Sequence, residues 1–121
     1  MELQTYGAVQ AGTENPRNTE YRLLAKVTRA LMESSPHVNG AFFKAVDWNR
    51  RVWLTLQMDL ASEDNLLPDD LKARLISLAI WVDKHSAAVL RGTAEVGALI
   101  DVNRAIMEGL AARPEETRLA S

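Results

Sequence analysis

The 121-residue chain contains no cysteine, which excludes disulfide bonds and thiolate metal ligands and leaves the redox compartment undetermined. No apolar run approaches the roughly 20 residues that a membrane-spanning helix requires. The first ten residues also lack the basic start and the apolar stretch of a secretory signal. We therefore expect a cytoplasmic protein with no membrane contact.

A basic excess is also missing, since 14 Lys and Arg residues stand against 16 Asp and Glu residues, for a net charge of -2. Nucleic-acid-binding domains usually gather a basic excess on one face, so we expect no DNA partner and rank RNA last among partners. The hydrophobic share of 47% and the charged share of 25% are typical of a globular domain. A chain of this length suits one hydrophobic core.

No segment sustains the period-two alternation of a strand, whereas helical patterns recur at about 19–33, 41–61, 68–90 and 94–112. Short connections make neighbouring helices antiparallel. The sequence therefore predicts an all-α fold, a small antiparallel, up-and-down bundle of about four main helices. We expect a loosely ordered segment at 1–15, a helical domain at 16–113 and a polar tail at 114–121.

Several residues mark the expected helix ends. Asn18 or Thr19 suits the N-cap of the first helix, and Pro68 suits the first helical position of the third. Gly92 suits a left-handed helix stop, and Thr93 directly after it suits the N-cap of the fourth helix. The last two residues predict a tight hairpin between the third and fourth helices.

Apolar residues spaced by three and four define an inward side on each expected helix. The third helix carries a second apolar side at Ile76, Ile80 and Ala87, and a helix that is apolar on two sides is either central or covered by something else. The positions away from the inward side of the second helix are Trp48, Val52, Leu54 and Met58. The predicted inward positions are Tyr21, Leu24, Ala25, Thr28, Leu31, Met32, Phe42, Val46, Asn49, Trp53, Leu56, Leu60, Leu71, Leu75, Leu78, Val82, His85, Val89, Val96, Leu99, Ile100, Asn103, Ile106, Met107 and Leu110.

Residue patterns for catalysis or cofactor binding are absent. Asp83, His85 and Ser86 have the residue types of a hydrolytic triad, but adjacent helical side chains diverge by about 100° and cannot form a proton relay. His37 has no histidine or carboxylate near it in sequence to share a metal, and the six glycines match no phosphate-binding motif. We therefore expect no enzymatic activity, no catalytic residue, no metal and no cofactor. His85 lies on the inward side, so we predict that it is buried and hydrogen-bonded.

The three tryptophans are candidates for partner binding, because tryptophan and arginine are favoured where proteins bind one another. Trp53 lies on the inward side of the second expected helix, so we predict that it belongs to the core. Trp81 lies near the edge of the inward side of the third expected helix. Trp48, flanked by Arg51 and Val52, is predicted to contribute to a groove or face that receives a partner helix. The alternative for Trp48 is packing against the N-terminal segment.

Basic residues form an exposed line on the first helix, and a pair on the second. Both groups suit contact with an acidic partner or RNA phosphates, or else a solvated helix face, which the slightly negative net charge favours. The basic residues are Arg22, Lys26, Arg29, Arg50 and Arg51. The predicted partner-binding residues are Trp48, Arg51, Val52, Trp81, Arg22 and Arg29.

Four ordered stretches carry a family resemblance. They are TEYRLLAKVTRAL at 19–31, DWNRRVW at 47–53, ISLAIWVDKHSAAVLRG at 76–92 and LIDVNRAIMEGLA at 99–111. Read in this order, they resemble the FlaF family of small flagellar biosynthesis regulators from flagellated alphaproteobacteria. Similarity in this order over most of the chain is more specific than any short motif.

The resemblance implies a cytoplasmic non-enzyme that is needed for flagellin production and filament assembly. It implies flagellin as the first partner, bound by an export chaperone, in a pathway shared with FlbT, a regulator of flagellin mRNA translation. Three functions stay open, in this order: a flagellin-binding chaperone, a regulatory adaptor that pairs with FlbT, and a translational regulator that binds RNA directly.

Overall fold

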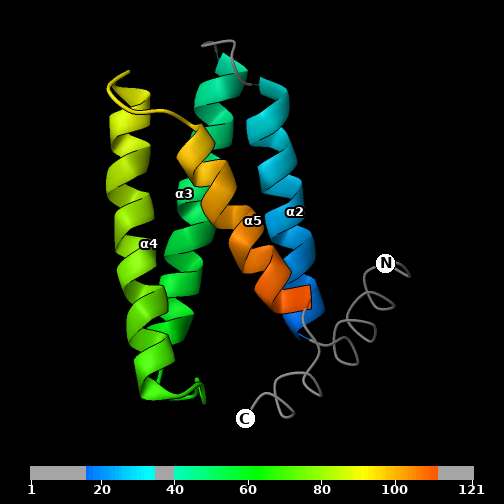
Figure 1. Ribbon diagram of the computed structural model, residues 1–121, viewed down its shortest axis with the longest axis vertical. Helices are drawn as coiled ribbons and strands as arrows, with labels where there is room; N and C mark the ends of the chain where they lie inside the picture. The colour runs from blue at the N-terminus through cyan, green and yellow to red at the C-terminus, as the bar shows by residue number, and fades with distance from the viewer. Residues whose placement is uncertain (1–15, 35–39, 112–121) are drawn as a thin grey trace, which may run out of the picture.

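The computed structural model describes residues 16–34 and 40–111, over which the chain forms helices and no strand. With the labels of Figure 1, the helices are α2 (Pro16–Ser34), α3 (Gly40–Ala61), α4 (Asp69–Leu90) and α5 (Gly97–Ala111). This confirms the predicted all-α fold. The expected N-terminal segment, most of the break around His37 and the C-terminal tail lie outside the described residues.

The chain direction alternates from helix to helix, so the helices form the predicted antiparallel bundle (Figure 1). α3 lies between α2 and α4, and α5 crosses the bundle diagonally instead of running beside α4 (Figure 1). α5 packs mainly against α2 and contacts α4 only weakly. The last helix thus departs from a regular up-and-down arrangement.

The connection between α4 and α5 differs from the predicted two-residue hairpin. Gly92 has φ 81°, the N–H of Gly92 donates to the carbonyl of Val89 (3.0 Å), and the N–H of Thr93 donates to the carbonyl of Ala88 (2.9 Å). This is a Schellman motif, in which the residues after a helix bond to its last carbonyls. The Thr93 hydroxyl also donates to Ala88 (3.1 Å), so the predicted N-cap role of Thr93 is wrong. The connection spans residues 91–96, which leaves room for α5 to turn away from α4.

Two other helix starts lie close to their predicted positions. α4 begins at Asp69, and Pro68 is its flanking residue, whose carbonyl accepts the bond from the N–H of Lys72 (2.9 Å). The predicted start is therefore one residue early. α2 begins at Pro16, so Asn18 and Thr19 lie inside its first turn and not at its N-cap. Proline is favoured at a first helical position because its missing N–H would have no helical partner there.

The buried apolar side chains form two clusters. Trp53 belongs to the larger cluster, with 2% of its surface exposed, which confirms the prediction. The prediction that Val52 lies on an outer side of the second helix is wrong, because α2 packs beside α3 and leaves Val52 only 6% exposed. The larger cluster consists of Leu31, Phe42, Ala45, Val46, Trp53, Ala79, Val82, Val89 and Leu99, and the smaller one of Leu24, Val27 and Val52.

The buried side of α4 agrees only in part with the predicted one, because Val82 and Val89 are buried as predicted but Ala79 and Ser86 are buried in addition. Its buried residues are Ala79, Val82, Ser86 and Val89, so two small residues let α4 approach α3 closely. His85, predicted to be buried, is only partly covered, and its Nε2 donates to the carbonyl of Glu95 (2.8 Å). Periodicity underestimated Ala79 and Ser86 because small residues contribute little to an apolar pattern.

A buried polar cluster joins three helices through Asn103 of α5. The indole N–H of Trp53 donates to Asn103 Oδ1 (2.8 Å). The amide of Asn103 donates to Asn49 Oδ1 (2.7 Å) and to Thr28 Oγ1 (3.1 Å). All four residues are buried. Because buried polar groups are costly unless hydrogen-bonded, this cluster favours one register of α5 over α2 and α3.

We predict that Asn103→Ala lowers the free energy of unfolding by about 2–4 kcal/mol, since it leaves the buried indole N–H of Trp53 and the amide oxygen of Asn49 without partners. Urea denaturation followed by circular dichroism measures this change. Asp101→Ala, at an exposed position two residues earlier, is the control, with an expected change within about 0.5 kcal/mol. A loss below about 1 kcal/mol for Asn103→Ala would contradict the central role of this amide.

Replacing the buried Ser86 is expected not to destabilise the protein, unlike replacing Asn103. Its hydroxyl oxygen is buried and has no hydrogen-bond partner in the part of the chain that the structure describes. Ser86→Ala removes this buried polar atom, so the free energy of unfolding stays the same or rises by up to about 1 kcal/mol. The same urea titration measures it. A clear loss of stability would show that the hydroxyl is bonded in solution.

Candidate partner-binding groove

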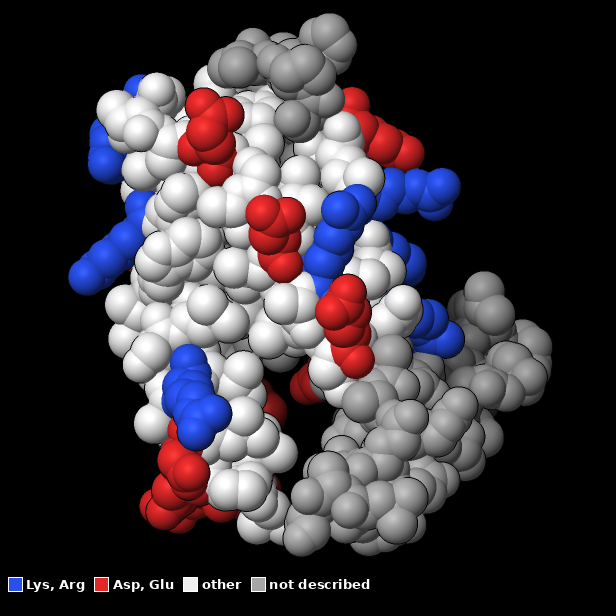
Figure 2. Space-filling model, in the orientation of Figure 1, with Lys and Arg blue, Asp and Glu red and all other residues white. Residues whose placement is uncertain are grey.

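An apolar groove with a volume of about 350 Å³ opens between α3, α4, α5 and the start of α2. Figure 2 shows it as a hollow beside the lower part of α4, next to uncharged surface. Its lining is mostly aliphatic. The lining residues are Glu20, Leu24, Trp53, Leu56, Asp59, Leu60, Asn65, Leu67, Leu71, Leu75, Ala105, Ile106 and Gly109.

The groove follows from the diagonal course of α5. A regular bundle would place its fourth helix along the whole of α4, over the side that carries Leu71 and Leu75. α5 instead packs against α2, so these two leucines line the groove (Figure 1). Leu71, predicted to face inward, is 39% exposed as a result. Within residues 16–34 and 40–111, α5 therefore leaves this part of α4 uncovered.

The turn between α3 and α4 forms one end of the groove. The Asn65 amide N–H donates to Asp59 Oδ2 (3.1 Å), and Asn65 Oδ1 accepts from the backbone N–H of Leu67 (3.1 Å). These bonds hold Leu67 at the groove. The charged residues in the lining are Glu20 and Asp59, both acidic, and carboxylates are visible in the hollow in Figure 2.

A second, more open hollow of about 610 Å³ lies between α2 and α3 and includes Trp48 and Arg51. Trp48 is 36% exposed and belongs to neither core cluster. The structure therefore brings together two residues of the predicted partner-binding face, while Val52 is buried elsewhere. The other residues of this hollow are Ala30, Glu33, Ser34, Ala41, Lys44 and Ala45.

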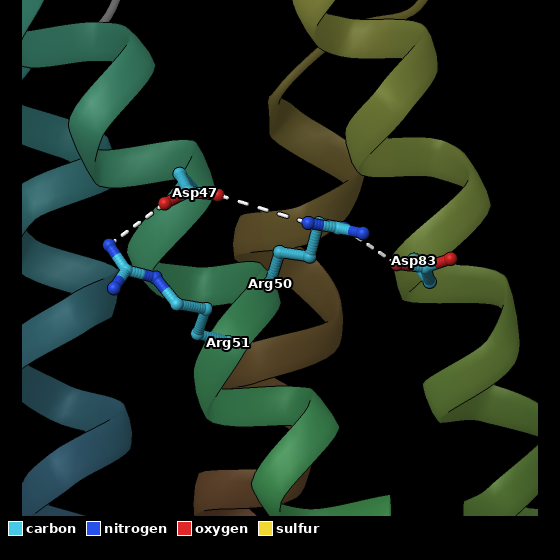
Figure 3. A network of polar contacts seen from close by, with 4 residues as sticks. All are labelled: Asp47, Arg50, Arg51 and Asp83. Atoms are coloured by element: carbon cyan, nitrogen blue, oxygen red, sulfur yellow. Dashed lines mark hydrogen bonds and ion pairs between the residues drawn. The ribbon is translucent and has the colours of Figure 1, made fainter.

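Carboxylates accompany the basic pair of α3, as Figure 3 shows. Arg50 Nε lies 2.7 Å from Asp83 Oδ1 and so links α3 to α4, and Arg50 Nη1 lies 3.9 Å from Asp47 Oδ1. Arg51 Nη2 lies 2.8 Å from the other oxygen of Asp47. Arg51 is largely exposed and the other three side chains are about two-fifths exposed, so each ion pair contributes at most about 1 kcal/mol to stability. Because carboxylates already accompany them, Arg50 and Arg51 are poorly suited to binding phosphates.

The remaining predicted partner-binding residues are not among the lining residues of either hollow, although Arg29 is paired with Glu33 of the second one. Arg29 pairs with Glu33 (3.3 Å) on the exposed side of α2, where Arg22 is also exposed. Trp81 on α4 stacks on the His85 ring, with centroids 4.6 Å apart and an interplanar angle of 18°. The predicted residues therefore do not form one continuous surface.

Sequence reasoning did not assign the groove residues to a binding site. Two signals were present: Leu66 and Leu67 are apolar residues in a polar connection, and α4 is apolar on two sides. Neither signal shows that α5 leaves part of α4 uncovered, because periodicity does not report how one helix crosses another.

The described residues offer no group of three or more His, Cys, Asp or Glu side chains that could hold a metal ion. Among the helices that the structure describes, none has the length and hydropathy to span a membrane. The groove offers apolar surface with an acidic edge.

Fold and groove together define a small all-α bundle protein with uncovered apolar surface between its helices. A family model described as "Flagellar protein FlaF" matches residues 2–110. The chain belongs to the FlaF family and is a flagellar protein, which confirms the resemblance seen in its sequence. No curated protein and no solved structure matches the chain.

We predict that Trp48→Ala changes the free energy of unfolding by less than about 1 kcal/mol, because Trp48 lies outside both core clusters. Trp53→Ala is the matched control, and loss of this buried ring costs about 3–5 kcal/mol. Thermal and urea denaturation of both variants measure the difference. Equal losses would place Trp48 in the core.

Proposed function

We propose that this FlaF-family protein is a non-enzymatic, cytoplasmic export chaperone that binds flagellin and thereby controls flagellin production. Two observations support the proposal: membership of a flagellar family and an apolar groove at the place where a bundle would hold another helix. The groove is the main support for the proposal, because exposed apolar surface of this shape suits an amphipathic helix from another chain.

Flagellin is a suitable occupant on physical grounds. Its terminal segments become amphipathic helices only when they pack against other surfaces, so they need cover before filament assembly. Two of the helices that line the groove each supply a pair of leucines one turn apart, Leu71 and Leu75 on α4 and Leu56 and Leu60 on α3. The cost of ordering a flexible segment on binding keeps the complex weak enough to release its cargo for export.

The second hollow supports a second candidate function, a regulatory adaptor that pairs with FlbT. It presents Trp48 and Arg51 on a face separate from the groove, and both residue types are enriched at binding hot spots. Direct RNA binding ranks last, because Arg29, Arg50 and Arg51 each lie beside a carboxylate.

Co-expression with flagellin and, separately, with FlbT, followed by size-exclusion chromatography, tests both candidates. We predict that the wild-type protein co-elutes with flagellin and that Leu71→Ser weakens this complex about tenfold or more, because it removes a leucine that the partner buries. Ile80→Ser is the matched control on the same helix, since Ile80 is 42% exposed and lies outside the groove.

Other outcomes separate the candidates. Equal effects of Leu71→Ser and Ile80→Ser would remove the groove as the flagellin site. Capture of FlbT without flagellin, lost in Trp48→Ala, would favour the adaptor. Binding to the flagellin mRNA leader that falls steeply with salt would favour the RNA reading. Co-elution with neither protein at micromolar concentration would contradict chaperone and adaptor together.

A further inference from the structure

We propose that the groove selects an amphipathic helix of another polypeptide that carries basic side chains at the end lying over the α3–α4 turn. The inference rests on the proposed function and deepens it, because it names the charge pattern of the bound segment and its direction in the groove.

The first observation is the charge of the turn. Residues 59–70 contain five carboxylates and no lysine or arginine, and the next basic residue is Lys72, in the first turns of α4. Asp59 lines the groove itself, while the others lie in the turn or at the start of α4. The five residues are Asp59, Glu63, Asp64, Asp69 and Asp70.

These charges are not cancelled within residues 16–34 and 40–111, where none of the five carboxylates forms an ion pair. Asp59 accepts a hydrogen bond from the neutral amide of Asn65, which orients the carboxylate and leaves its charge. Asp69 and Asp70 lie in the first turn of α4, where the positive end of the helix dipole offsets part of their negative charge. One end of the groove is therefore negative.

The second observation is the apolar surface beside these charges. Leu66 is 92% exposed, and Leu67 and Leu71 are also exposed next to the carboxylates. Leu71 and Leu75 are one turn apart on α4, about 6 Å along the helix axis. An occupant that presents apolar side chains at i and i+4 matches such a length. Its next turn would then lie over the acidic end.

Charge complementarity decides which polypeptide suits the groove. Opposite charges at the rim of an interface favour the right partner, and like charges exclude the wrong one. Residues 1–15 of this chain contain Glu2 and Glu14 but no lysine or arginine, and residues 112–121 balance Arg113 and Arg118 with Glu115 and Glu116, so the side chains of neither segment carry a net positive charge. A second copy brings a net charge of -2. A different polypeptide with a basic end is the better match.

Two labelled 18-residue helical peptides test this inference by fluorescence anisotropy with the full-length protein. Both carry the same apolar stripe, and their last turn carries three lysines in one and three glutamates in the other. We predict that the lysine peptide binds about tenfold more tightly at low ionic strength, and that 0.5 M salt removes most of this difference.

A variant with Asp59→Asn and Asp69→Asn keeps the shape of both side chains and removes two charges. It should bring the preference for the lysine peptide down to about threefold or less. Asp101→Asn with Glu95→Gln is the matched control, because it removes two carboxylates from exposed positions outside the groove. This control should keep the full preference.

Equal affinity for the two peptides, no binding of either, or the same loss in the control variant would overturn the inference. A dimer that dissociates on Leu71→Ser would place a second copy in the groove and would also overturn it. The flagellin co-elution experiment is separate. If the protein captures flagellin but does not distinguish the two peptides, only the charge preference is contradicted. If it binds the peptides selectively but does not capture flagellin, only flagellin as the partner is contradicted.

Discussion

The hydrogen bonds of Asn103 are the constraint on which the arrangement depends. One amide on α5 accepts from the indole of Trp53 and donates to Asn49 and Thr28, all in the buried core. A sliding or rotating α5 would leave several of these groups without partners, at a cost of about 1–3 kcal/mol each. The cluster therefore holds α5 across α2 and α3, and this diagonal position keeps α5 away from the first half of α4.

The part of α4 that residues 16–34 and 40–111 leave uncovered is the basis of the proposed role. Leu67 and Leu71 remain exposed, although burying a leucine side chain contributes about 1.5–3 kcal/mol. A partner that covers them gains this free energy, whereas the chain alone does not. The carboxylates of the α3–α4 turn lie at the same place. In the proposed complex, the apolar surface would supply affinity, and the acidic edge would supply direction and choice of partner.

Prediction from sequence succeeded where a signal is local or strongly periodic. The existence and order of the four helices, the left-handed Gly92, the buried Trp53 and the inward Asn103 all agree with the structure, although the start of α5 lies three residues later than predicted. It failed where two helices meet. Val52 is buried because α2 covers the second side of α3, and His85 stays partly exposed because the buried side of α4 is centred on Ala79, Val82, Ser86 and Val89. The groove was missed for the same reason, since no single helix contains it.

By itself, the sequence determined that the chain forms an antiparallel set of helices and that it belongs to the FlaF family. Helical periodicity, helix-breaking residues and family similarity depend only on the order of residues along the chain. Only the tertiary structure decided which apolar residues are buried and which line the groove. Leu71 and Val82 both fit the apolar pattern of α4, yet one is exposed and the other fully buried. The difference is the crossing angle of α5, which depends on side-chain packing and buried hydrogen bonds between residues far apart in the chain.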